Sequence, residues 1–169
     1  FISDHLFYFT QDTLKTTLEA NGFEIFESKE IWHKYIISAV IRKRKPTDLS
    51  VFYVYQEKIK TELNEFINQF NSKEVAVWGA GHQALAVLAL AEIGDRIKYV
   101  VDSAPFKQGK YTPATHIPIV SQELLTTEPV EAVIVMAAAY SDEVVKIIKS
   151  QFSDDITVSV LRDYGLEVI

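Results

Sequence analysis

From Lys73 onward, short apolar runs alternate with stretches whose apolar residues recur at helical spacing. A continuous apolar run of about four to eight residues is typical of a strand that is covered on both faces. The pattern predicts strands at Glu74–Trp78, Ile97–Val101, Ala132–Met136 and, last in the chain, Thr157–Leu161, and helices at His82–Ile93, Ser121–Thr126 and Ser141–Gln151. This alternation predicts an α/β fold, a Rossmann-like parallel sheet with helices on both faces.

The first 45 residues predict one helix followed by two strands. Thr10 is a suitable N-cap for a helix over about Gln11–Ala20, and the pair Asn21-Gly22 tolerates the left-handed backbone that ends a helix. Strands are expected to begin at Phe23 and to cover Tyr35–Ile41, which is rich in strong strand formers. Because a stable core needs roughly three strands and a helix, this segment is expected to pack against other parts of the protein.

A break at Pro46-Thr47-Asp48 precedes a long amphipathic stretch. Its apolar residues fall on one helical stripe, which predicts a helix over about Val54–Asn71: Tyr55, Ile59, Leu63, Phe66, Ile67 and Phe70. We interpret it as an ordinary packing helix, although its length also suits an interdomain or dimer-forming helix. The predicted organisation is a helix and hairpin over residues 1–45, a helical linker over 46–72 and a Rossmann-like domain over 73–169.

Composition narrows the function classes. The 169 residues are 48% hydrophobic and 24% charged, as in globular proteins. The net charge of -6 disfavours nucleic-acid binding, because phosphate backbones reward clustered Lys and Arg. Without cysteine the chain holds no disulfide or thiolate metal site, and no apolar run approaches the ~20 residues of a membrane span. We expect a cytoplasmic protein that binds small ligands, and, since it begins at Phe1, a piece of a longer protein.

The run from Gly79 to Ala84 fits the phosphate-binding pattern G-x-G-x-x-G/A, directly after a predicted strand and at the start of a predicted helix. Gly79 permits the tight turn, Gly81 lets the backbone approach a pyrophosphate, and Ala84 allows close helix packing. The helix start at His82 would present N–H groups to phosphates. Asp102 ends the next strand about 20 residues further on, where such sites place an acid for ribose hydroxyls. The alternative is a Rossmann-like scaffold that no longer binds a nucleotide.

The segment Ser103–Ile119 is expected to be an extended loop past the carboxyl end of the second predicted strand, the edge where open α/β sheets bind ligands. Lys107 and Lys110 could neutralise phosphate charge, and Tyr111 could stack on a base or sugar. The alternative is a solvated surface loop. We interpret His116 as a structural histidine, and Ser121 as the N-cap of the short helix that follows.

The stretch from Val100 to Ile119 resembles the C-terminal domain of the SAM-dependent sugar C-methyltransferase family. That domain carries the pattern D-x-x-x-x-K-x-G-K/R-Y-x-P-G-x-x-I-P-I, with Ala114 here in place of the last Gly. The run Met136–Glu143 is similar to the family's L-A-W-N-x-x-D-E-I segment, with Ala138 for Trp and Ala139 for Asn. Asp4–Thr10 resembles the E-H-x-x-Y-F-S/T run late in the family's methyltransferase domain, whose closing helix and hairpin match the segment that follows.

The resemblance implies a reaction in which a proton next to a ketone is removed and the carbon is methylated. It implies His5 as the base and Asp4 as the residue that orients or stabilises the ring. It also implies a nucleotide-linked sugar as substrate, SAM bound by the parent protein outside this chain, and zinc in the region that precedes Phe1. The chain alone is then expected to bind no cofactor and to be inactive.

Two other readings of the sequence stay open. One is a stand-alone module that binds a nucleotide or sugar nucleotide without chemistry. The other is a scaffold that forms a homodimer through the predicted 54–71 helix.

Overall fold

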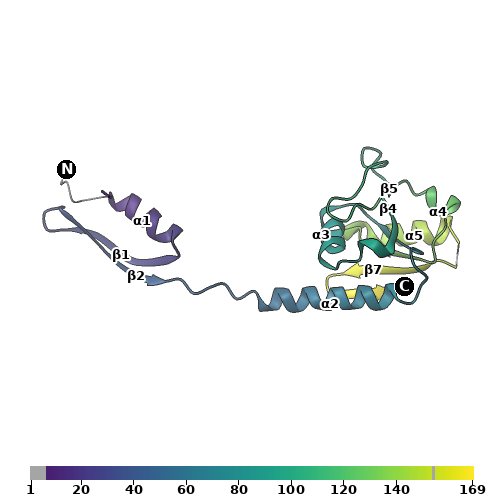
Figure 1. The fold of residues 1–169 in the computed structure, drawn as a ribbon, viewed down its shortest axis with the longest axis horizontal. Helices are drawn as coiled ribbons and strands as arrows, with labels where there is room; N and C mark the ends of the chain where they lie inside the picture. Colours follow the sequence, from purple (N-terminus) through teal and green to yellow (C-terminus); the bar gives the residue numbers. More distant parts are fainter. Residues whose placement is uncertain (1–6, 154) are drawn as a thin grey trace. The chain divides into compact units, whose positions relative to one another are not determined.

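The computed structural model describes residues 7–153 and 155–169. The chain divides into two compact units, Phe1–Asp48 and Leu49–Ile169 (Figure 1). The elements of the first unit are α1 (Gln11–Ala20), β1 (Phe23–Ile31) and β2 (Ile36–Lys43). The helices of the second unit are α2 (Ser50–Ile67), α3 (His82–Leu90), α4 (Leu124–Thr127) and α5 (Ser141–Gln151). Its strands are β3 (Val75–Trp78), β4 (Ile97–Val101), β5 (Ile119–Val120), β6 (Ala132–Val135), β7 (Thr157–Arg162) and β8 (Gly165–Val168).

The first unit is a helix and an antiparallel hairpin, which confirms the predicted order of elements. Thr10 caps α1, because its hydroxyl accepts from the Thr13 N–H at 3.2 Å while the Thr13 hydroxyl accepts from the Thr10 N–H at 2.8 Å. The Gln11 side chain donates to the Ser28 carbonyl at 2.7 Å and joins α1 to β1. None of the described residues of this unit is buried, so the three elements enclose no core of their own.

The second unit is built on one sheet of six strands in the order β5-β4-β3-β6-β7-β8. Strands β5, β4, β3, β6 and β7 run parallel, and β8 pairs antiparallel with β7. The order runs from β3 outward to β5 on one side and from β6 outward to β8 on the other. This confirms the predicted Rossmann-like sheet and places its switch point between β3 and β6, where doubly wound sheets bind ligands.

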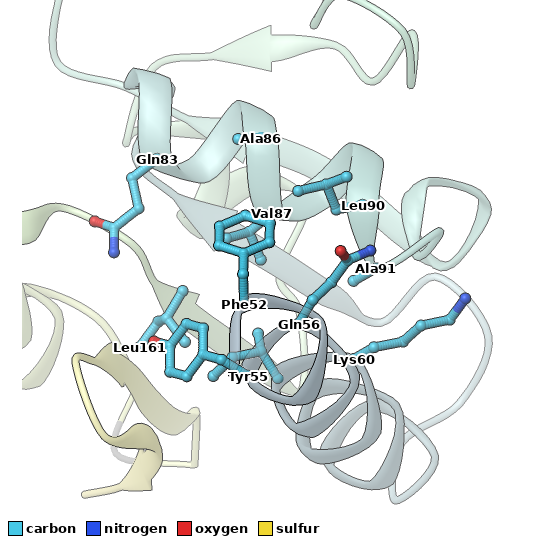
Figure 2. Close-up of a pocket in the computed structure, with 11 residues that line it drawn as sticks. Phe52, Tyr55, Gln56, Lys60, Gln83, Ala86, Val87, Leu90, Ala91 and Leu161 are labelled. Atoms are coloured by element: carbon cyan, nitrogen blue, oxygen red, sulfur yellow. The ribbon is translucent and has the colours of Figure 1, made fainter. Parts of the chain in front are cut away.

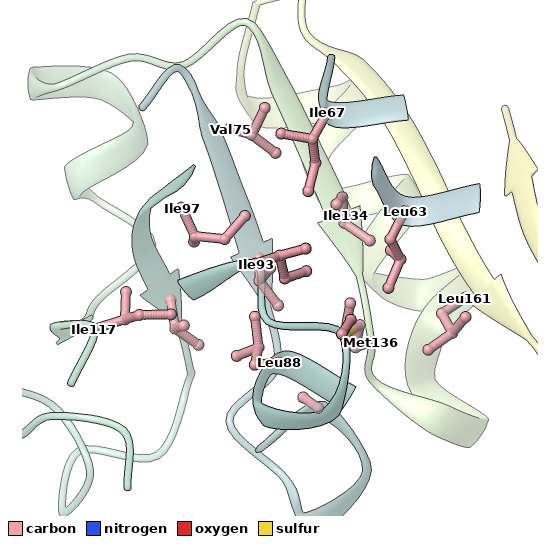
Figure 3. Packing of buried hydrophobic residues seen from close by; sticks show 14 of the residues in the cluster. Leu63, Ile67, Val75, Leu88, Ile93, Ile97, Ile117, Ile134, Met136 and Leu161 are labelled. Carbon is pink, nitrogen blue, oxygen red and sulfur yellow. The ribbon is translucent and has the colours of Figure 1, made fainter. Parts of the chain in front are cut away.

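Buried apolar residues cover both faces of the sheet, so all four residues of β3 and of β6 are buried. On one face α2 and α3 pack against the strands, and Figure 3 shows Leu63 and Ile67 of α2 beside Val75 and Ile134. On the other face Val144, Val145 and Ile148 of α5 pack in a second cluster with Trp78 and Tyr99. Burial on both faces explains why the strands read as unbroken apolar runs.

Helix α2 has two halves with different surroundings. Its second half contributes four residues to the core: Ile59, Leu63, Phe66 and Ile67. Glu62 accepts a hydrogen bond from the Leu166 N–H at 2.8 Å and Lys58 donates to the Tyr164 carbonyl, so α2 also holds the turn between β7 and β8. Its first half leaves apolar side chains exposed: Val51, Phe52, Tyr53, Val54 and Tyr55.

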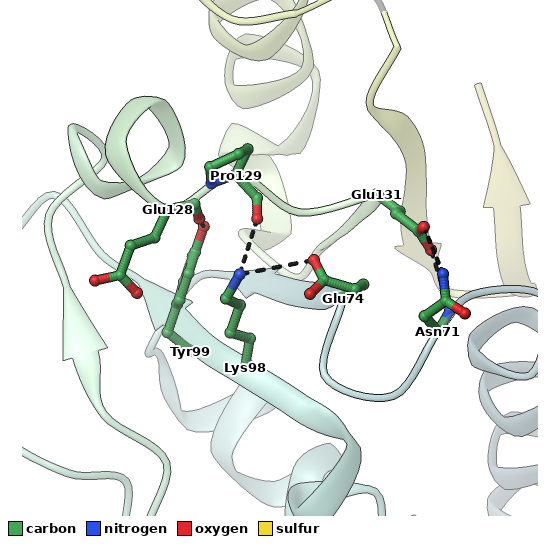
Figure 4. Close-up of polar contacts among 7 residues, drawn as sticks. All are labelled: Asn71, Glu74, Lys98, Tyr99, Glu128, Pro129 and Glu131. Atoms are coloured by element: carbon green, nitrogen blue, oxygen red, sulfur yellow. Dashed lines mark hydrogen bonds and ion pairs between the residues drawn. The ribbon is translucent and has the colours of Figure 1, made fainter.

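Polar contacts at the amino ends of the strands hold the connection between α4 and β6 (Figure 4). Lys98 Nζ donates to the Pro129 carbonyl at 2.9 Å and lies 3.6 Å from the Glu74 carboxylate. The Tyr99 hydroxyl donates to the Glu128 carbonyl at 2.6 Å. These groups lie at the end of β4 opposite to Asp102 and tie the amino ends of the strands to the α4–β6 connection.

Two strand predictions were wrong. Thr157–Leu161 is not the last strand, because a two-residue turn at Asp163 and Tyr164 leads into β8. The expected extended loop Ser103–Ile119 is shorter, because Ile119 opens the edge strand β5 and Tyr111 forms an antiparallel bridge with Pro118. Strands of two to four residues carry too few positions for a recognisable pattern.

Helix boundaries were also corrected. Helix α2 begins at Ser50 and ends at Ile67, four residues earlier at each end than 54–71. Helix α3 ends at Leu90, since Glu92 adopts φ 56°, a left-handed conformation that a helix cannot continue through. Ser121 is not an N-cap: its carbonyl accepts from the Leu124 N–H in a turn, and α4 begins after Glu123 without a side-chain cap.

We expect Leu63→Ala to lower the free energy of unfolding by about 2–5 kcal/mol, because the Leu63 side chain of α2 is fully buried against the sheet. Leu90→Ala is the matched control, since Leu90 is 47% exposed and its loss should cost less than about 1 kcal/mol. Urea unfolding followed by circular dichroism measures both. Equal losses would show that the second half of α2 is not part of the core.

Candidate functional site

The turn between β3 and α3 begins at Gly79, which is held between two neighbouring strands. Its N–H donates to the Val101 carbonyl of β4 at 2.8 Å. On the other side, a side chain at position 79 would place its Cβ 2.5 Å from the Met136 carbonyl oxygen, and the φ of 121° is itself unfavourable for other residues. Gly79 is therefore required by the chain's own backbone.

Gly81 differs from Gly79, because nothing in the chain's own structure demands a glycine there. Its φ is -86°, and a Cβ would meet no atom within 4 Å. Gly81 is the N-cap of α3, and no side chain caps this helix. The N–H groups of the first turn have no partner within the helix, so the start of α3 offers unused donors beside an open surface.

Asp102 joins the turn after β3 to the loop after β4. Its Oδ2 accepts from the Ala80 N–H at 2.8 Å and pairs with Lys107 Nζ at 3.0 Å, while Oδ1 accepts from the Ala104 N–H at 2.9 Å. Burial alone would raise the pKa of this carboxyl. The hydrogen bonds from Ala104, Lys107 and Ala80 outweigh burial and hold the pKa below its usual value, so Asp102 is ionised at neutral pH.

A carboxylate has about four acceptor positions, and three donors occupy Asp102. One acceptor position therefore remains for a hydroxyl of a ligand. Lys107 uses one of its three N–H donors on Asp102, and its ammonium lies 5.9 Å from the Phe106 ring centre. Asp102 and Lys107 together therefore present one unused acceptor position and two unused N–H donors next to each other.

An open cleft of about 600 Å³ lies at the carboxyl ends of β3, β4 and β6. Five of the predicted site residues line this cleft: Gly79, Gly81, His82, Asp102 and Lys107. Gln83, which belongs to the predicted glycine turn, lines it as well. The structure thus brings together the glycine turn, the helix start and the acid, at the switch point of the sheet.

Two candidate residues lie outside this cleft. Lys110 and Tyr111 are exposed and do not line it. The Tyr111 ring instead stacks on His116, with centres 4.3 Å apart and an angle of 4° between the planes. His116 is exposed and does not line the cleft, and its stacking on Tyr111 is compatible with the structural role expected for it. Asp4 and His5 lie outside the described residues.

The sequence analysis missed the contribution of the connection between β6 and α5. Ala137, Ala138 and Tyr140 line the cleft, and Ala138 adopts φ 50°, which is rare for a residue with a side chain. The signal that could have found them is the sheet order itself, because β6 is the strand next to β3 across the switch point in doubly wound sheets.

A smaller apolar groove of about 190 Å³ lies between α2 and α3. Figure 2 shows Phe52 and Tyr55 of α2 reaching toward Val87 and Leu161, with Gln83 at one end of the groove. Among the described residues, no group of three or more His, Asp or Glu side chains is arranged to hold a metal ion. None of the described helices combines the length and the apolar character that crossing a bilayer requires.

The sheet order, the turn and the cleft define a doubly wound α/β domain with an uncapped helix start and an open cleft at its switch point. A family model described as the C-methyltransferase C-terminal domain matches residues 40–157. The chain belongs to this family, which confirms the resemblance in the sequence.

No curated protein sequence matches the chain. Among solved structures, UDP-D-quinovosamine 4-dehydrogenase from Vibrio fischeri is similar over 59% of this chain and 94% of its own. The TM-score is 0.45 and the sequence identity 14%.

We expect Gly79→Ala to lower the free energy of unfolding by about 3 kcal/mol, because the new Cβ clashes with backbone that cannot move aside. Gly81→Ala is the matched control at the same turn and should cost about 1 kcal/mol or less. Thermal and urea unfolding measure both. If Gly81→Ala proves as costly, the contrast between the two glycines is contradicted.

Proposed function

We propose that this domain binds the nucleoside diphosphate part of a nucleotide-linked sugar for a SAM-dependent C-methyltransferase. The observation that carries the proposal is the uncapped start of α3, which opens into the cleft beside Lys107. The helix start and a lysine together suit an anion, and the vacant space above Gly81 allows a phosphate to approach the backbone. Membership in the family supports the connection to methyl transfer.

The charges of the cleft favour a ligand that is anionic at one point and polar beside it. Lys107 has donors left for a phosphate oxygen after pairing with Asp102. Asp102 has one acceptor position left for a ribose hydroxyl. A ribose attached to the phosphate would then lie over the end of β4, with the phosphate at Gly81 and His82.

The proposal assigns the methylation step to the parent protein. SAM would be bound outside this chain and would supply the methyl group, and any zinc would likewise be held by the parent protein outside this chain. His5 is proposed to remove the proton next to the ketone, with Asp4 orienting its ring. This chain alone is proposed to be catalytically inactive, and a cytoplasmic location without nucleic-acid or membrane partners remains part of the proposal.

Titration calorimetry on the chain tests the proposal with dTDP, UDP, GDP, CDP, NAD and SAM. We expect at least one nucleoside diphosphate to bind, and Lys107→Ala to weaken it about tenfold because a charge-assisted contact is lost. Gly81→Ala should also weaken it, because the methyl group occupies the approach to the backbone. SAM should give no heat of binding.

Lys98→Ala is the control for charge, since Lys98 lies at the opposite end of β4 from Asp102 and should leave the affinity unchanged. The proposal fails if no nucleoside diphosphate binds, or if the Lys98 and Lys107 variants lose affinity equally. Binding of SAM at micromolar concentration would contradict the assignment of the SAM site to another part of the parent protein.

The alternative function, a dimerisation scaffold, is favoured by one observation. Five consecutive residues at the start of α2 are apolar or aromatic and exposed: Val51, Phe52, Tyr53, Val54 and Tyr55. Such a contiguous apolar surface commonly marks an interface. A second copy of α2 packed against it would bury these side chains and fill the groove beside Val87.

We expect sedimentation equilibrium to decide this alternative. If the scaffold function holds, the chain sediments as a dimer, and Phe52→Glu shifts it to a monomer because a charge cannot be buried in an apolar contact. Lys146→Glu, on α5, is the control and should leave the dimer intact. A monomer at all concentrations contradicts the scaffold and leaves the nucleotide proposal unaffected.

A further inference from the structure

A second cavity lies next to the cleft, on the other side of the switch point. Its volume is about 340 Å³. It is bordered by the start of α3, the connection between β6 and α5, and the turn between β7 and β8: Gln83, Ala138, Ala139, Leu161, Arg162, Asp163 and Tyr164. The cavity thus occupies the half of the sheet edge that the proposed nucleotide leaves vacant.

The two cavities are adjacent, because Gln83 and Ala138 line both of them. Gln83 follows directly on the helix start where the diphosphate is proposed to lie, and Figure 2 shows its side chain extending away from α3. Ala138 and Ala139 carry only methyl groups and are exposed. A group attached to the far phosphate therefore passes Gln83 and enters the second cavity without displacing a large side chain.

The position of Asp102 indicates which end of the proposed ligand lies over which strands. Its free acceptor position lies at the end of β4, on the opposite side of α3's start from β7. In doubly wound sheets a two-part ligand crosses the switch point, with one part over each half of the sheet. With the ribose over β4, the second part lies over β6 and β7.

The charges of the second cavity disfavour another phosphate. Its cation, Arg162, is held by Asp142 at 2.6 Å and by Glu167 at 2.9 Å. Asp163 adds a further exposed carboxylate to the lining. The carboxylates of Asp142 and Glu167 more than neutralise the Arg162 guanidinium, and Asp163 adds another negative charge. The cavity is therefore acidic and would repel a second anionic group.

The remaining groups of the second cavity suit a neutral polyol. The Gln83 amide donates and accepts and the Asp163 carboxylate accepts, while the Tyr164 hydroxyl is already hydrogen-bonded to Glu167. Leu161 and the Tyr164 ring offer apolar surface for the C–H groups of a sugar ring. Lys58 of α2 holds the backbone of the turn at Tyr164 by donating to its carbonyl.

We propose that the cavity between Gln83, Ala139 and Asp163 is a sugar subsite, which binds the hexose of a nucleotide-linked sugar whose diphosphate lies at the start of α3. This inference rests on the proposed nucleotide function and adds where the sugar lies and which residues recognise it.

Titration calorimetry on the full chain tests the subsite by comparing each nucleoside diphosphate with its hexose conjugate: UDP with UDP-glucose, dTDP with dTDP-glucose, and GDP with GDP-mannose. For the base that binds, the conjugate should bind about tenfold more tightly, as expected for one or two additional hydrogen bonds. NAD, which carries a nicotinamide riboside in place of the hexose beyond the same diphosphate, should bind more weakly than the conjugate.

Two variants touch the second cavity alone. Ala139→Leu fills it and Asp163→Ala removes an acceptor, and neither residue lines the first cleft. Each should bring the ratio of the two affinities close to one while the affinity for the nucleoside diphosphate stays unchanged. Asp95→Ala, an exposed carboxylate at the amino end of β4, is the matched control and should preserve the ratio.

Equal affinities of conjugate and nucleoside diphosphate in the unaltered chain would overturn the subsite and leave the nucleotide function standing. So would a ratio that Ala139→Leu does not change, or NAD as the tightest ligand. If neither nucleoside diphosphates nor conjugates bind, both the nucleotide function and the subsite fail.

Discussion

The backbone after β3 passes so close to the end of β6 that position 79 has no room for a side chain. This close approach sets the direction in which α3 leaves the sheet, and Asp102 then fixes the same turn from the side of β4 through the Ala80 N–H. Three neighbouring strands are thus joined at one point. The cleft, the orientation of the helix start and the acid beside Lys107 all depend on that junction.

The junction also separates what the fold needs from what a ligand would use. Gly79 and the three hydrogen bonds to Asp102 serve the chain itself. Gly81 accepts from the Leu85 N–H through its carbonyl, but the first N–H groups of α3 have no side-chain cap, and Lys107 uses only part of its donors on Asp102. Gly81 suits the N-cap of α3, and its missing side chain leaves the space above the helix start open.

Much of the sheet could be predicted from the sequence, because strands buried on both faces are apolar at every position, as Val75–Trp78 and Ala132–Val135 are. Strands β5 and β8 could not be predicted. They are only two and four residues long, and their pairing with β4 and β7 places them in the sheet. In the site, the residues of the glycine turn and Asp102 were predictable because local spacing fixes them. Lys110 and Tyr111 were not, because the bridge between Tyr111 and Pro118 decides where that loop points. Tyr140 and Ala138 join the site only through the sheet order.

The two short strands at the borders of the sheet have a consequence for the behaviour of the chain in concentrated solution. β5 has two residues, and the turn that leads into β8 is held by Glu62 and Lys58 of α2. Long, free edge strands invite other chains to add strands and aggregate. One border is kept short and the other is tied to a helix. The fold thereby protects a sheet whose central strands β3 and β6 are made almost entirely of valine, isoleucine and alanine from association with its own copies.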